Sequence, residues 1–179
     1  MTQPIESASL DEIVGAPGPH PEHADALMLF GQLVGSWDVV STQFAPDGRT
    51  RTLRGEWHFF WVLEGRAIQD VIIAPPRGER DRTKWVEGDY QTAIRFYRPS
   101  DGSWDVTAIS PPHNQIRRLV ARREDDKIVL RGTAPDGQHV RWMFYEITTE
   151  RCRWRGQVSS DGGETWVTEE EMILTRRRE

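Results

Sequence analysis

The sequence is short of two residue types, cysteine and lysine. Cysteine occurs once, at Cys152, so no disulfide can form within the chain. A single thiol fits a reducing compartment, and we expect a cytoplasmic protein. Lysine occurs only at Lys84 and Lys127, so 21 of the 23 cationic residues are arginine. Arginine binds carboxylates and phosphates through two parallel hydrogen bonds, which makes any arginine inside the fold a candidate ligand contact.

Several sequence signals are absent as well. No apolar run approaches the roughly 18 residues of a membrane span, and the first residues lack the basic start and apolar stretch of a signal peptide. The motifs Gly-x-Ser-x-Gly and Gly-x-Gly-x-x-Gly do not occur, which argues against a serine-hydrolase elbow and a dinucleotide loop. The net charge of −5 argues against a general nucleic-acid surface. We therefore expect a small-molecule partner, with neither nucleic acid nor membrane.

What the sequence does contain is a short helical pattern followed by many short β-prone runs. Residues 1–20 carry Pro, Gly and Ser without periodicity and are predicted to be a flexible arm. Apolar residues then recur at helical spacing, which predicts a helix from Pro21 to Gln32. From Trp37 onward, turn residues separate ten predicted strands, at 37–44, 51–63, 66–73, 90–98, 103–110, 115–123, 127–133, 138–147, 151–159 and 165–175.

Tight turns between nearly all of these strands predict antiparallel neighbours. The expected fold is all-β: residues 21–179 form one domain, an antiparallel up-and-down barrel of about ten strands with a short N-terminal helix. A two-sheet sandwich is the alternative. The one long connection, residues 74–89, is either a lid over one barrel end or a solvated charged loop.

Particular strings carry a resemblance to a known family. Gly35-Ser36-Trp37 opens the first strand and Arg176-Arg177 ends the last, with GEWHFFWVLEGRAIQD, RFYRPSDGSWDV and SSDGGETW between them. The chain resembles bacterial calycin-like (lipocalin-related) β-barrel proteins of unknown function over about residues 30–177. The resemblance implies a cavity rather than a reaction, and packing of Trp37 against Arg176 or, as second choice, Arg177. Haem-binding calycin relatives use a late histidine; here none follows His139, so we expect no cofactor.

Strand alternation then predicts which side chains face inward. A turn at Glu64-Gly65 places Asp70 on an aromatic face, and the next turns add Arg95 and Arg141. A buried charge must be paired or functional, so Asp70 is either one end of a structural salt bridge or part of a ligand site. The candidate ligand-binding residues are Asp70, Arg95, Arg141, Trp57, Phe59, Trp61, Tyr97, Trp104, Tyr145 and Trp154.

Three function classes remain open at this point. The first is a binding protein for a small hydrophobic or amphipathic molecule, whose polar or anionic group meets the spare arginine. The second is a cofactor-free lyase, isomerase or cyclase that uses Asp70 as general acid or base, with Tyr97 or His58 as the second proton-transfer group. The third is a structural barrel with a solid Trp-rich core that forms a homodimer through an outer sheet face. The His-x-x-His pair at His20 and His23 lacks further ligands, so we expect no metal site.

Overall fold

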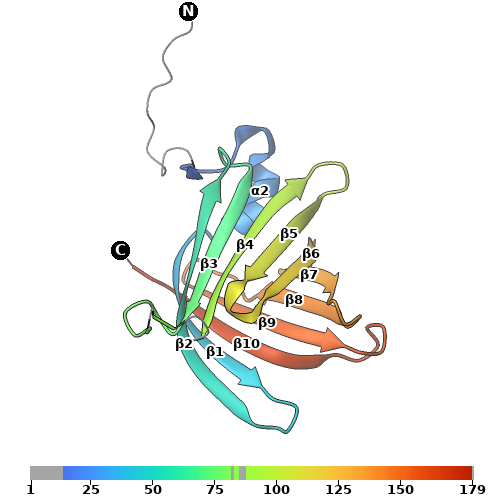
Figure 1. The fold of residues 1–179 in the computed structure, drawn as a ribbon. Coiled ribbons are helices and arrows are strands. Elements are labelled where there is room, and N and C mark those ends of the chain that lie inside the picture. Colours follow the sequence, from blue (N-terminus) through green and yellow to red (C-terminus); the bar gives the residue numbers. More distant parts are fainter. Residues whose placement is uncertain (1–13, 82, 85–87, 179) are drawn as a thin grey trace, which may run out of the picture.

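A computed structural model describes residues 14–81, 83–84 and 88–178. In it, ten antiparallel strands close into a barrel, each paired with its neighbours along the chain and β1 paired with β10 (Figure 1). The prediction of an all-β up-and-down barrel is confirmed, and the sandwich alternative is wrong. The described residues include no helix long and apolar enough to cross a membrane. The strands are β1 (Gly35–Phe44), β2 (Thr50–Val62), β3 (Ala67–Ala74), β4 (Asp89–Arg98), β5 (Ser103–Ser110), β6 (Gln115–Glu124), β7 (Lys127–Thr133), β8 (His139–Tyr145), β9 (Arg151–Ser159) and β10 (Val167–Arg176).

A short helix closes one end of the barrel. The predicted helix forms as a 3₁₀ turn, η1 (Pro21–His23), followed by α2 (Ala24–Gly31). The helix lies at the upper end of the barrel in Figure 1. Phe30 and Leu33 are fully buried there because their spacing places both on the face that meets the barrel interior. At the opposite end, which carries the 3₁₀ turn η2 (Pro111–His113), the described part of the chain forms no such helix.

The segment before the helix follows the barrel wall. Gly15 forms a β-bridge with Val62, and the Ala16 and His20 N–H groups donate to the carbonyls of Trp61 and Gly65 at 3.1 and 3.0 Å. Residues 14–20, predicted to be part of a flexible arm, therefore contact β2 and the β2–β3 turn. Residues 1–13 of that arm lie outside the described residues.

Trp37 and Arg176 meet as the Gly-x-Trp motif predicts. The Arg176 guanidinium lies 4.1 Å from the centroid of the fully buried Trp37 ring, and the Trp37 indole donates to the Leu33 carbonyl at 2.8 Å. Arg176 also donates to the carbonyls of Gln32 and Val34, which ties the helix end to the last strand. Gly35 is required beside Arg176, because the φ of Gly35 is +124° and an added Cβ would lie 2.5 Å from Arg176 Nη1.

The strand registers decide which side chains point inward. The pairs Trp57–Ile72, Phe59–Asp70 and Trp61–Ile68 are confirmed, as are Tyr97–Trp104 and Arg95–Val106. The register predicted for the hairpin of β8 and β9 is wrong by one residue.

In that hairpin Phe144, rather than Tyr145, pairs with Trp154. The connection is longer than the two-residue turn expected at Thr149-Glu150: Glu146 already adopts a left-handed φ of +50°, and Thr148 N–H donates to the Arg151 carbonyl. A shift of one residue exchanges the two faces of a strand, so Arg141 and Tyr145 lie on the outside of the barrel.

The long connection between β3 and β4 does not cover a barrel end in its described part. Arg77 folds back onto Glu56 on the outer face of β2, and the Arg80 guanidinium lies 4.8 Å from the Tyr90 ring centroid. None of the described residues between Pro75 and Gly88 lines the internal cavity. These residues therefore give the lid interpretation no support; residues 82 and 85–87 lie outside the described part.

Glu56 binds residues from both the β3–β4 connection and the C-terminal end of the chain. Its carboxylate is only 3% exposed and accepts hydrogen bonds from Arg77 Nε at 2.9 Å and from Arg177 Nη1 at 2.9 Å, with His58 Nε2 at 3.2 Å. Burial alone would raise the pKa of Glu56, but these hydrogen bonds outweigh it and lower the pKa from 4.5 to about 2.

We expect Glu56 to make folding stability depend on acid pH. Because its pKa is lower in the folded state, its stabilising contribution is present above pH 4.5 and is lost as the pH falls toward about 2. Urea unfolding between pH 6 and 2.5 should therefore show a shallower loss of stability for Glu56→Gln than for the wild type. Parallel curves for the two proteins would contradict the assignment, and Glu64→Gln, an exposed carboxylate at the tip of the β2–β3 turn, is the control.

Candidate ligand-binding site

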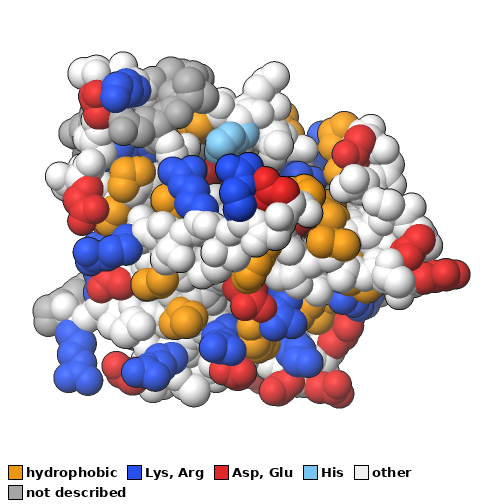
Figure 2. All heavy atoms as spheres, turned by 90° about the horizontal axis from the view of Figure 1, so that it is seen from below, with side chains coloured by type: hydrophobic (Ala, Val, Ile, Leu, Met, Phe, Trp, Pro, Cys, Tyr) orange, Lys and Arg blue, Asp and Glu red, His pale blue; other side chains and the backbone are white. Residues whose placement is uncertain are grey.

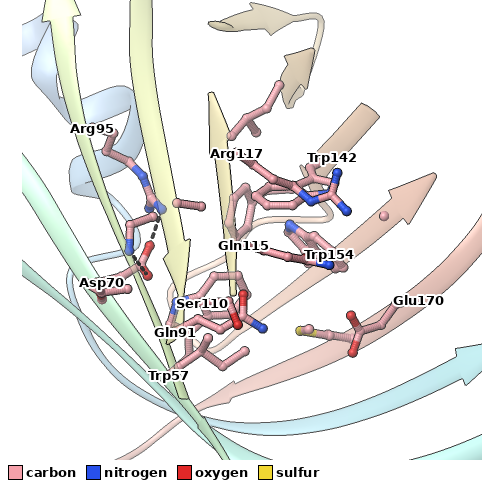
Figure 3. A pocket seen from close by; sticks show the side chains of 18 of the residues that line it. Trp57, Asp70, Gln91, Arg95, Ser110, Gln115, Arg117, Trp142, Trp154 and Glu170 are labelled. Carbon is pink, nitrogen blue, oxygen red and sulfur yellow. Dashed lines mark hydrogen bonds and ion pairs between the residues drawn. The ribbon is translucent and has the colours of Figure 1, made fainter. Parts of the chain in front are cut away.

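A partly open cavity of about 180 Å³ lies inside the barrel, between the helix-covered end and the end that carries η2 (Figure 3). Two rows of paired residues explain why there is space. Asp70, Ala93, Ala108 and Arg117 are successive partners across β3 to β6, so two alanines separate the charged side chains. Across the barrel, Gly156 sits between Trp142 and Glu170 in the same way. Small residues at the centre of both rows leave the interior open.

Aromatic side chains form the apolar part of the wall. The ring centroids of Trp57 and Phe144 are 5.5 Å apart, and those of Trp142 and Trp154 are 5.7 Å apart. Trp57 also meets Trp154 edge to face at 6.4 Å. These contacts hold the rings in fixed orientations, so the cavity offers preformed flat surfaces for a planar or aliphatic ligand body.

Asp70 and Arg95 form an ion pair inside the barrel. Both residues are 2% exposed; Arg95 Nη2 donates to Asp70 Oδ2, and the Ala93 N–H donates to Oδ1 at 3.2 Å. The Arg95 guanidinium also lies 4.9 Å from the Phe30 ring centroid beneath the helix. Burial raises the pKa of Asp70, and the positive charge of Arg95 opposes that rise. Trp57 is close enough to lower the same pKa, although its indole makes no hydrogen bond of normal geometry.

Buried polar atoms without a partner gather at this cavity. Five such side-chain atoms occur among the described residues, and every one belongs to a residue that lines the cavity. Four of the five carry N–H donors and the fifth is a hydroxyl. Buried donors are almost always satisfied in folded proteins, so such a concentration requires a specific explanation. The atoms are Trp57 Nε1, Arg95 Nε, Arg95 Nη1, Ser110 Oγ and Arg117 Nη1.

Arg117 supplies the uncompensated positive charge. The Asp70 carboxylate offsets the charge of Arg95, whereas the Arg117 guanidinium makes no ion pair or hydrogen bond with any described residue. Arg117 follows the mouth residue Gln115 on β6 and precedes the buried Leu119, so alternation turns it inward.

A carboxyl group lies on the other side of the cavity. Glu170 Oε1 accepts from Ser41 Oγ and lies 3.4 Å from Gln43 Nε2. Burial, together with the nearby carboxylates of Asp89 and Glu169, raises the pKa of Glu170. Figure 3 shows Glu170 on the side of the cavity away from the Asp70–Arg95 pair, with Trp154 between them.

The structure brings together only part of the predicted site. Four of the candidate residues line the cavity: Asp70, Arg95, Trp57 and Trp154. Four others face inward but pack beneath the helix, at the closed end: Phe59, Trp61, Tyr97 and Trp104. Arg141 and Tyr145 are corrections, because the shifted register places them outside, where Arg141 lies 4.0 Å from the Trp166 ring centroid and binds Gln157.

The proposed proton-transfer partners of Asp70 are also apart from it. His58 lies on the outer face of β2 and binds Ser36 Oγ at 2.9 Å and Glu56, and Tyr97 packs against His23 and Trp104 near the helix. Cys152 is buried, and burial raises the pKa of its thiol to about 12, so it is a packed residue and no nucleophile at neutral pH. The described residues hold no cluster of three His, Cys, Asp or Glu side chains suited to a metal.

The barrel end opposite the helix carries charges of both signs. Figure 2 views the molecule from this side and shows arginine and lysine side chains interspersed with aspartate and glutamate. No patch of one sign dominates this face.

Comparison with known proteins identifies a fold and no family. No family model matches the chain, and no curated protein matches it. The crystal structure of Rv2717c from M. tuberculosis is similar with a TM-score of 0.59 and 17% identity, over 89% of this chain and 99% of that chain. The S-type phycobiliprotein lyase CPES from Guillardia theta is similar with a TM-score of 0.57 and 10% identity, over 90% and 99%. These likenesses show the closed β-barrel fold and nothing beyond it.

Proposed function

We propose that this protein binds a small amphipathic molecule inside the barrel and holds its acidic group against Arg117, Arg95 and Ser110. The observation that carries the proposal is the set of unpaired buried donors, all on cavity-lining residues. Each unsatisfied buried donor costs about 1–3 kcal/mol, and a ligand with two acceptor oxygens removes several such costs at once. An acidic ligand also neutralises Arg117, whose charge no described side chain offsets.

The size of the cavity limits the ligand. A volume of about 180 Å³ compares with an engineered cavity of roughly 150 Å³ that accommodates benzene. The ligand body is therefore of single-ring size, or an aliphatic chain of about six carbons. The aromatic wall of Trp57, Trp142 and Trp154 suits a flat ring in particular.

The enzyme alternative built on Asp70 receives less support. Both carboxylate oxygens of Asp70 accept a hydrogen bond, Oδ2 from Arg95 and Oδ1 from the Ala93 N–H. The ion pair with Arg95 stabilises the ionised carboxylate, which weakens Asp70 as a base. His58 and Tyr97, the partners considered for it, do not line the cavity. The scaffold alternative is disfavoured because the barrel core contains a cavity rather than being solid.

Calorimetric titration with benzoate and hexanoate tests the proposal. We expect at least one of these acids to bind, and Arg117→Met to weaken that binding about tenfold or more, because a hydrogen-bonded charge contributes about 1.5–3 kcal/mol. Arg118→Met is the matched control: Arg118 is adjacent on β6, exposed and outside the barrel, so its loss should leave affinity unchanged. Equal loss in both variants would contradict the proposed contact.

A second variant fills the cavity without removing a charge. Ala108 lies between Ala93 and Arg117 on the cavity wall, and Ala108→Phe places a ring in the proposed binding space. We expect it to abolish acid binding while the protein remains folded, at a stability cost of about 1–3 kcal/mol. Undiminished binding by a folded Ala108→Phe protein, or no binding of either acid to the wild type, would refute the proposed function.

A further inference from the structure

The cavity has a second polar wall, directly across the barrel from the wall that carries unpaired donors. In the closed strand order, β10 is five strands from β5 in both directions, so Glu170 on β10 is opposite Ser110 on β5. Arg117 on β6 pairs with Ala108, and Arg95 on β4 pairs with Val106, so they lie one and two inward-facing positions of β5 deeper in the barrel than Ser110. Four of the five unpaired donor atoms, those of Arg95, Ser110 and Arg117, therefore lie on β4 to β6, and the acceptor Glu170 lies across the cavity on β10.

Glu170 is held with one oxygen available. Oε1 accepts a hydrogen bond from the Ser41 hydroxyl and lies near the Gln43 amide, while Oε2 receives no hydrogen bond from any described residue. Polar neighbours on β1 thus hold the carboxyl group at the cavity edge without saturating it. Carboxyl oxygens normally accept several hydrogen bonds, so Oε2 has unused capacity on a residue that lines the cavity.

A local irregularity of β10 creates this arrangement. The pairing with β9 passes from Gln157–Thr168 to Gly156–Glu170, so Glu169 is an extra residue in β10. Thr168 consequently lies outside, bound to Gln157, whereas Glu170 points inward next to Met172. Bulges of this kind re-aim single side chains and are frequent beside binding sites. The partner residue Gly156 has no side chain, which leaves the space before Glu170 open.

Between the two polar walls the lining is aromatic. Trp57, Trp142, Phe144 and Trp154 line the cavity on the strands that separate β10 from the donor wall. The inference rests on the proposed function. The geometry points to a ligand with two poles: a planar single-ring acid that carries a hydrogen-bond donor, a hydroxyl or amino group, on the side away from its acidic group. The acid meets Arg117, Ser110 and Arg95, and the donor group meets Glu170 Oε2.

Titrations with benzoate, 3-hydroxybenzoate and 4-hydroxybenzoate test this inference. We expect at least one hydroxybenzoate to bind the wild type about tenfold more tightly than benzoate, because its hydroxyl gains a charge-assisted hydrogen bond. In Glu170→Met that gain, taken as the ratio of hydroxybenzoate to benzoate affinity in the same variant, should vanish. Glu171→Met is the matched control, since Glu171 binds Arg155 on the outer face and its loss should preserve the gain.

The outcomes separate this inference from the proposed function. Benzoate binding with no gain from either hydroxyl, or with a gain that survives in Glu170→Met, would overturn the two-pole ligand and leave the binding function intact. Failure of all three acids to bind the wild type would overturn both. Thermal melting of each variant establishes that it is folded, and Glu170→Gln, which keeps one acceptor oxygen, should retain part of the gain if Glu170→Met does not fold.

Discussion

Replacing Asp70 with asparagine should lower the free energy of unfolding by about 3–5 kcal/mol, because it leaves a buried arginine without its counter-charge. Arg95 is 2% exposed and its guanidinium cannot lose its proton at accessible pH. With Asp70 ionised, the pair buries no net charge; with asparagine, one positive charge remains inside. Urea unfolding at pH 7 measures the difference.

Asp105→Asn is the matched control for this experiment. Asp105 pairs with Arg98 on the outer face of β5, where both side chains are partly exposed, and such pairs contribute at most about 1 kcal/mol. A double variant, Asp70→Leu with Arg95→Met, should recover much of the stability, because an apolar pair of similar volume removes both desolvation penalties. If Asp70→Asn costs no more than Asp105→Asn, Asp70 is neutral in the folded protein and the ion pair is misassigned.

The same variant also bears on ligand binding. In Asp70→Asn the charge of Arg95 is no longer offset, so an anionic ligand in the cavity can compensate it. We expect benzoate to stabilise Asp70→Asn more than it stabilises the wild type, measured as the increase in melting temperature at saturating ligand. Equal stabilisation of the two proteins would indicate that the acid group does not reach Arg95.

The barrel itself was predictable because its turns are marked and its first hairpins have one clearly apolar face. Trp57, Phe59 and Trp61 alternate with Glu56 and His58, so only one face of β2 suits the interior. The resulting pairing of Phe59 with Asp70 is the pairing in the structure. The contact of Trp37 with Arg176 followed from the Gly-x-Trp motif in the same way.

The site was only partly predictable because β8 carries hydrophobic side chains on both faces. In β8, Trp142 and Phe144 point inward, but Met143 and Tyr145 on the outer face are just as hydrophobic. The unusual connection after β8 then decides the register, and no sequence signal marks its extra length.

The two polar residues that were missed did leave a signal. Arg117 precedes Leu119 and Ala121 in strict alternation, and Glu170 precedes Met172 and Leu174, so each continues an inward apolar series. A charged residue at the end of such a series marks the point where the interior meets a cavity or solvent. The bulge at Glu169 could not be read from sequence, since a run of three glutamates gives no indication of which one is extra.

Replacing Trp37 with alanine should destabilise the fold by about 3–5 kcal/mol, the range for a large aromatic side chain removed from a core. Trp37 is fully buried, donates to the Leu33 carbonyl at the helix end and supports the Arg176 guanidinium at 4.1 Å. Its loss therefore leaves a cavity and also removes the surface on which Arg176 holds the helix to β10.

Trp166→Ala provides the matched comparison for Trp37→Ala. Trp166 lies outside the barrel and is partly exposed; it contacts the Arg141 guanidinium at 4.0 Å, an interaction of about 0.5–1 kcal/mol at such sites, and its indole donates to the Gly163 carbonyl at 3.0 Å. Urea unfolding of both variants should thus show a clearly larger loss of stability for Trp37→Ala than for Trp166→Ala. Arg176→Met should fall between them, because it keeps the packed ring but loses the hydrogen bonds to the Gln32 and Val34 carbonyls. If Trp37→Ala and Trp166→Ala cost the same, the helix plug does not depend on the Trp37–Arg176 contact and the barrel end is held by Phe30 and Leu33 alone.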